Sequence, residues 1–123
     1  MRHFLIFACL GFLLTACSTT KQSGSTLFTL SGNNPFWSAE ISEGGIIFEE
    51  LGREKVSYPY VKGESSNDRT IFLTSKKING EKNWLKITLI KKTCQENIAG
   101  TKKLPYQVEI EKDGRTFYGC GKD

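Results

Sequence analysis

Apolar and polar residues alternate along several short stretches of the chain, and this alternation limits the fold more than any other feature. Leu85, Ile87 and Leu89 fall on one side of an extended segment, and Val108 and Ile110 do the same in a later one. A period of two residues places each set on one face of a β-strand, with polar residues on the other face. The pattern predicts antiparallel strands with one buried and one solvated face.

Residues that tolerate the positive φ angles of tight hairpins separate the apolar stretches. They form three pairs: Gly44-Gly45, Asn79-Gly80 and Asp113-Gly114. Turns and alternation together predict an all-β fold, a small antiparallel barrel of about eight short strands, closed or nearly closed because closure removes exposed edges. The strands are expected at Leu27–Leu30, Phe36–Ser42, Ile46–Leu51, Lys55–Val61, Thr70–Lys76, Asn83–Lys92, Pro105–Lys112 and Arg115–Cys120.

The same alternation predicts which side chains form the core. We expect Trp37, Ala39 and Ile41 to be buried, with Ile71 and Leu73 joining them from another strand. Helical periodicity is absent over any useful length, and residues 95–101 are expected to form one helical turn at most. The chain has 123 residues, enough for a single domain, which we place at residues 27–123.

The N-terminal segment has the pattern of an export signal. Arg2 precedes an apolar run over residues 4–14, which is too short to cross a hydrocarbon core of about 30 Å as a helix. Such a run suits a secretory signal. The sequence Leu14-Thr15-Ala16-Cys17 resembles the lipobox of bacterial lipoproteins, in which the cysteine thiol takes a diacylglycerol and the peptide is cut just before it. The resemblance implies a removed signal peptide at residues 1–16 and lipidation of Cys17; the alternative is an ordinary signal with an unrelated cysteine.

Residues 17–26 are small and polar, which predicts a flexible tether between the lipid and the domain. Acyl chains on Cys17 would hold the protein on a membrane. Ser18 follows this cysteine, at the position where the inner-membrane retention signal of enteric bacteria has aspartate. By that analogy we expect a lipid anchor in the outer membrane, with the domain facing the periplasm.

Two cysteines, Cys94 and Cys120, remain once Cys9 leaves with the signal and Cys17 is acylated. In an oxidising envelope compartment such a pair is most simply a disulfide. A metal-binding pair of thiols is the alternative, but it needs further ligands, and the single histidine lies in the signal segment at His3. We therefore expect no metal and no cofactor.

Residue types that carry common enzyme chemistry are scarce. Without His3 no histidine remains to activate a nucleophile. Neither the phosphate-binding nor the dinucleotide-binding glycine motif occurs. Glu49 and Glu50 are neighbours on an expected strand, so they point to opposite faces and cannot share a substrate. We expect a protein that is not an enzyme.

Residues 32–37, with the sequence GNNPFW, are the first candidate binding element. The Asn-Pro step restricts the residue before proline to extended geometry, so one strand ends here and two aromatic residues enter the next at a fixed angle. Phe36 and Trp37 must face opposite ways, one toward the core and one toward the surface. Tyr58 and Tyr60 are candidates for the same aromatic edge; the alternative is a loop with a core tryptophan.

Charge is unevenly distributed along the chain, whose formal net charge is +4. Lysines dominate residues 76–103, whereas glutamates dominate residues 40–54. Trp84 lies between Lys82 and Lys86 on the outward face, and the three residues form the second candidate binding surface. Such a surface fits an envelope protein, another anionic partner or an anionic membrane, where each lysine contributes about 1 kcal/mol. Nucleic acid is not expected as a partner of an exported protein; the alternative is a solvated face.

The GNNPFW segment, together with Leu104-Pro105-Tyr106 and the terminal Gly119-Cys120, resembles a family of small uncharacterised bacterial envelope lipoproteins. Its members show a G-x-x-P-F-W entry, a Y-P-Y-like strand and a terminal G-C. The domain is more loosely similar to META-type domains and to membrane-bound inhibitors of c-type lysozyme, which are small β-rich envelope modules. These motifs are structural and imply no particular activity.

The sequence therefore predicts a non-enzymatic, lipid-anchored envelope lipoprotein that acts as a binding or envelope-maintenance module. An inhibitor of a lysozyme-like, peptidoglycan-degrading enzyme is the alternative. Those inhibitors enter the enzyme cleft with a loop bearing serine and tyrosine, of which Ser57-Tyr58 is a fragment. A basic domain is a poor electrostatic match for a basic lysozyme, which favours the first interpretation.

Overall fold

The computed structural model describes residues 25–95 and 102–123. The expected signal peptide, Cys17, nearly all of the expected tether and most of the expected turn at residues 95–101 lie outside the described residues. Within the described ranges no helix is long and apolar enough to cross a membrane. The strands are β1 (Thr26–Asn33), β2 (Phe36–Ser42), β3 (Gly45–Glu50), β4 (Val56–Tyr58), β5 (Glu64–Ser66), β6 (Arg69–Ile78), β7 (Glu81–Ile90), β8 (Cys94–Gln95), β9 (Lys103–Leu104), β10 (Tyr106–Lys112) and β11 (Arg115–Lys122).

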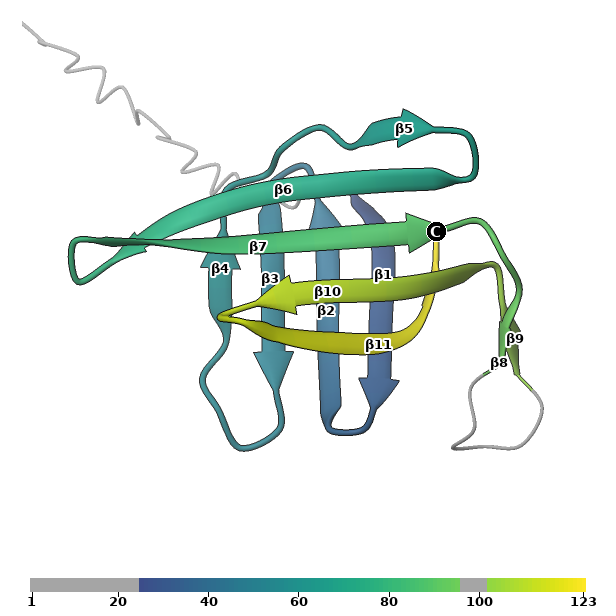
Figure 1. The fold of residues 1–123 in the computed structure, drawn as a ribbon, viewed down its shortest axis with the longest axis horizontal. Coiled ribbons are helices and arrows are strands. Elements are labelled where there is room, and N and C mark those ends of the chain that lie inside the picture. Colours follow the sequence, from purple (N-terminus) through teal and green to yellow (C-terminus); the bar gives the residue numbers. More distant parts are fainter. Residues whose placement is uncertain (1–24, 96–101) are drawn as a thin grey trace, which may run out of the picture.

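Nine strands form one antiparallel sheet in the order β4-β3-β2-β1-β11-β10-β7-β6-β5, while β8 pairs with β9 separately. The large sheet curls on itself, so that β6, β7, β10 and β11 cross the layer formed by β1 to β4 (Figure 1). Its two ends approach each other where Thr74 Oγ1 of β6 donates a hydrogen bond of 2.7 Å to the carbonyl oxygen of Pro59, just after β4. The expected all-β antiparallel barrel is confirmed as a half-barrel.

All of the expected strands are present; Phe36–Ser42 has the predicted bounds as β2, and the other strands differ at one or both ends. Three strands escaped prediction, namely β5, β8 and β9, because each has only two or three residues and shows no alternation. Tyr60 and Val61 lie beyond the end of β4 instead of inside it. Two of the three expected turns are confirmed: φ is 51° at Asn79 and 52° at Asp113, and the φ of the glycine after each is also positive. The third turn lies at residues 43–44, because Gly45 already belongs to β3 and pairs with Ser42.

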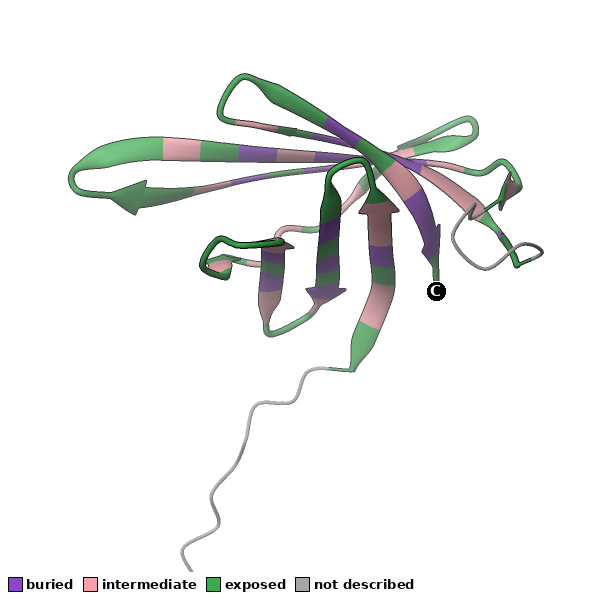
Figure 2. Ribbon diagram, turned by 90° about the horizontal axis from the view of Figure 1, so that it is seen from below, coloured by how far each residue is buried: buried purple, intermediate pink, exposed green. Residues whose placement is uncertain are grey.

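The core lies between the two layers of the curled sheet. Buried residues recur at every second position along the strands, which gives the banded pattern in Figure 2. Leu85, Ile87 and Leu89 are buried as expected. An aromatic cluster fills one part of the core, where the ring centroids of Phe48 and Phe117 are 5.2 Å apart.

The expectation that Leu73 joins the core is wrong. Its side chain is 51% exposed, and Ile71 on the same face of β6 is only partly buried. Phe72 and Thr74 point inward instead, because they pair with inward-facing residues of β7. The apolar run in β6 has hydrophobic residues on both faces, so the register with β7 decides which face is buried.

Candidate functional site

A groove of about 380 Å³ lies where β1, β2, β8 and β11 come together. Phe36 and Tyr118 line it with side chains that are 50% and 64% exposed. The buried Trp37 and the disulfide between Cys94 and Cys120 also line it. The groove therefore combines exposed aromatic rings with a rigid, cross-linked base.

The turn between β1 and β2 places the two aromatic residues. β1 ends at Asn33 and β2 begins at Phe36, on either side of a cis peptide bond between Asn34 and Pro35. Phe36 is half exposed and Trp37 is buried, as their alternation on a strand requires. Stacking on Phe48, with ring centroids 6.1 Å apart, fixes the indole ring from the core side.

Two glycines allow Trp37 to lie directly against β11. The indole Nε1 donates a hydrogen bond of 3.1 Å to the carbonyl oxygen of Tyr118. A Cβ atom on Gly32 would lie 2.1 Å from Nε1, and one on Gly119 would lie 2.0 Å from the carbonyl oxygen of Ser31. Neither position has room for a side chain. The two glycines therefore let the GNNPFW segment and the terminal Gly-Cys pair pack directly against each other at this groove.

The predicted disulfide is confirmed. It joins Cys94 of β8 to Cys120 of β11 with a Cα–Cα distance of 5.5 Å. β8 and β9 do not belong to the large sheet, and the disulfide cross-links this small sheet to β11. It also closes the side of the groove that β8 forms.

The structure does not bring the two tyrosines around Pro59 to this groove. Tyr58 is 2% exposed and belongs to the core, and Tyr60 packs partly buried against that core. The Tyr58 hydroxyl is buried without a hydrogen-bond partner among the described residues. Burial raises the pKa of this hydroxyl, and the negative charge of Asp113 adds to the effect.

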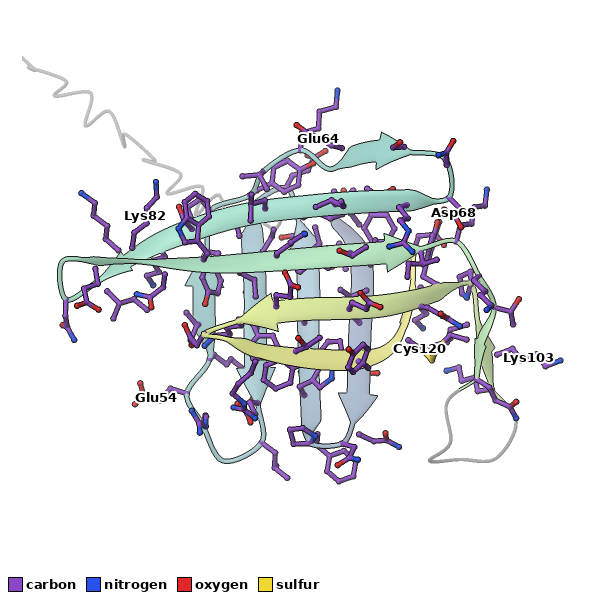
Figure 3. The ribbon with its side chains drawn as sticks, in the orientation of Figure 1. Glu54, Glu64, Asp68, Lys82, Lys103 and Cys120 are labelled. Atoms are coloured by element: carbon purple, nitrogen blue, oxygen red, sulfur yellow. A yellow bond between two sulfur atoms is a disulfide. The ribbon has the colours of Figure 1, made fainter. Side chains whose placement is uncertain are left out.

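Lys82, Trp84 and Lys86 form a separate surface on β7. The Lys82 ammonium lies 4.5 Å from the centroid of the Trp84 ring, a cation–π contact. Lys86 makes a long ion pair of 3.9 Å with Glu111 on β10. In Figure 3 the labelled Lys82 and Cys120 lie toward opposite ends of the layer, so this surface and the groove are apart.

A further charged contact joins β3 to β11. The Arg115 guanidinium binds both oxygens of Glu50, at 2.9 and 3.0 Å, and Arg53 lies 3.5 Å from the same carboxylate. Hydrogen bonding by Arg115 is the main reason that the pKa of Glu50 is lowered. Over residues 25–95 and 102–123, no group of three or more His, Cys, Asp or Glu side chains lies close enough to hold a metal ion.

Sequence reasoning missed Tyr118 at the groove and both Leu73 and Lys77 beside the lysine surface. The signal for Tyr118 was present, because a residue next to the apolar Phe117 on a strand must face outward. The positions of Leu73 and Lys77 beside this surface follow from the pairing of β6 with β7, which the sequence of either strand alone does not show. Comparisons with protein-family models, with curated proteins and with solved structures find no match.

Proposed function

We propose that this chain is a non-enzymatic, lipid-anchored lipoprotein of the bacterial envelope that binds a partner protein at the aromatic groove. The groove itself carries the proposal, because it places Phe36 and Tyr118 in an exposed position over a disulfide-bonded base. Aromatic side chains of this kind dominate the binding energy of protein interfaces. Its volume of about 380 Å³ lies at the small end of the range found for ligand-binding clefts.

The disulfide supports an extracytoplasmic location. Disulfides persist in oxidising compartments and are rare in the cytosol. The lipobox-like segment ending at Cys17 supplies the anchor, and Ser18 favours the outer membrane. A tether of residues 17–26 spans at most about 35 Å when extended, so the domain would stay close to the membrane surface.

The positions of Ser57 and Tyr58 do not support the alternative that the chain inhibits a lysozyme-like enzyme. Tyr58 is buried in β4, so Ser57 and Tyr58 do not form a protruding loop that enters an enzyme cleft. A binding module that uses the groove accounts better for the exposed aromatic residues.

The anchor is tested by metabolic labelling with palmitate. We expect label in the wild-type protein and none in Cys17→Ser, with loss of the variant from the membrane fraction. An unlabelled wild-type protein would refute the lipoprotein assignment.

The groove is tested by crosslinking in intact envelopes followed by mass spectrometry. We expect Phe36→Ala and Tyr118→Ala each to reduce recovery of the same envelope protein, because truncating an aromatic hot spot costs about 2 kcal/mol, or roughly 30-fold in affinity. Ile47→Ala is the matched control, since this exposed residue on β3 does not line the groove. Equal recovery in all three variants would reject the groove as the binding site.

A further inference from the structure

The hairpin of β6 and β7 extends beyond the rest of the sheet. β10 pairs with β7 only as far as Leu85, whereas β6 and β7 remain paired out to Ile78 and Glu81. The last part of the hairpin is therefore a two-stranded ribbon, visible as the projection in Figure 1. Because this ribbon projects from the rest of the sheet, its side chains can contact a surface while the rest of the domain keeps its structure.

One face of this hairpin collects lysines and apolar side chains. We define the hairpin face by the outward-facing residues Leu73, Lys77, Lys82, Trp84 and Lys86. Their parity is opposite to that of the inward-facing residues of β6 and β7, so they share one side of the ribbon.

Lys77 and Lys82 face each other directly across the two strands. Like charges at opposed positions destabilise a sheet. Among the described residues, neither lysine forms a salt bridge, and Lys86 has only its long contact with Glu111. The hairpin face thus keeps an uncompensated positive charge that an anionic surface would neutralise.

Two large apolar side chains lie among these lysines. Leu73 is 51% exposed and Trp84 is 48% exposed. Tryptophan at the level of lipid headgroups, with lysines that extend toward phosphate, is the usual composition of a membrane-interface segment. A small soluble polyanion would account for the lysines but would leave Leu73 and Trp84 exposed to water.

We propose that the hairpin face docks on an anionic phospholipid surface, with Trp84 and Leu73 at the headgroup level and the lysines on phosphate groups. The biological setting of this contact rests on the proposed envelope location, but the physical contact does not require the acyl anchor. A basic patch adds electrostatic attraction to anionic lipid to the attachment that acyl chains supply.

The test uses residues 17–123 with Cys17→Ser, so that no acyl chain contributes. This chain keeps every residue of the core cluster and both cysteines of the disulfide. We expect sedimentation with vesicles of phosphatidylglycerol and phosphatidylcholine, little with phosphatidylcholine alone, and release by salt. Brominated lipid should quench Trp84, while the buried Trp37 supplies an unquenched background.

A matched pair of charge reversals locates the contact. Lys77→Glu/Lys82→Glu keeps two like charges opposed, so the fold carries the same repulsion with the sign reversed. We expect it to weaken vesicle binding roughly 30-fold or more, from about 1 kcal/mol for each lysine removed. Lys91→Glu/Lys92→Glu changes the net charge equally just beyond the other end of β7 and should bind nearly as well as the parent chain.

Four results would overturn the proposal. They are no binding of the parent chain to phosphatidylglycerol vesicles, equal losses in both variants, binding that leaves Trp84 unquenched, and equally tight binding of dextran sulfate with the same dependence on the two lysines. The last result would assign the face to a soluble polyanion. None of these outcomes bears on palmitate labelling or on the groove variants, so failure here is distinguishable from failure of the proposed function.

Discussion

Removing the disulfide should destabilise the domain through its unfolded state. Cys94 and Cys120 are separated by 26 positions. Closing a loop of this length lowers the entropy of the unfolded chain enough to contribute about 3.5 kcal/mol to the free energy of unfolding. Cys94→Ala/Cys120→Ala should therefore lower the unfolding free energy by about that amount, which is roughly a 400-fold change in the folding equilibrium and a fall in Tm of roughly 15–25 °C.

Urea unfolding followed by tryptophan fluorescence measures this loss, and reduced wild-type protein is the matched control. The reduced protein keeps both sulfur atoms, so it separates loss of the bond from loss of packing at the buried Cys120. The urea m-value should also rise, because an unfolded chain without the cross-link exposes more surface. A loss below about 1 kcal/mol in both proteins, with an unchanged m-value, would refute the loop-entropy argument.

Four further substitutions test the core and the charged contact. Tyr58→Phe should raise the unfolding free energy by about 1 kcal/mol, because it removes a buried hydroxyl without a partner, and a lower Tm would contradict this. Leu85→Ala should cost about 2–5 kcal/mol in a denaturant melt, whereas Leu73→Ala should cost under 1 kcal/mol. Hydrogen bonding by Arg115 lowers the pKa of Glu50, so the pair stabilises the fold at neutral pH. This stability is present above the ordinary glutamate pKa of 4.5 and is lost as the pH falls from there through the lower pKa of the folded state. Glu50→Gln should flatten the fall in stability over that acid range, and an unchanged pH profile would contradict the assignment.

Local patterns in the sequence determined much of the sheet. Leu85, Ile87 and Leu89 alternate with polar residues, and the Asn-Gly turn before them sets the register of the hairpin. Alternation with these buried residues also predicts an outward-facing Trp84 between two lysines, and Lys82 and Trp84 are both exposed. In β6, however, Ile71, Phe72 and Leu73 are consecutive apolar residues, so alternation alone did not show which of them is buried.

The groove depends on contacts that no local pattern reveals. Ser31 pairs with Cys120 across the join between β1 and β11, which are distant in sequence. This pairing brings Tyr118 beside Trp37, and it requires Gly119 to approach the backbone of the other strand. The sequence indicated that these residues were unusual but not that they meet, because the pairing of the first and last strands is set by closure of the whole sheet.

The two proposed contacts are compatible because they lie apart. Cys120, which lines the groove, and Lys82, on the hairpin face, lie toward opposite ends of the front layer (Figure 3). The groove and the hairpin face share no residue, so a domain that contacts lipid through the hairpin face keeps the groove residues out of that contact. Sites this far apart with no shared residues should act additively. Phe36→Ala should leave vesicle binding unchanged, and Lys77→Glu/Lys82→Glu should leave partner capture by the solubilised domain unchanged; coupling between the two would mean that both surfaces serve one larger interface.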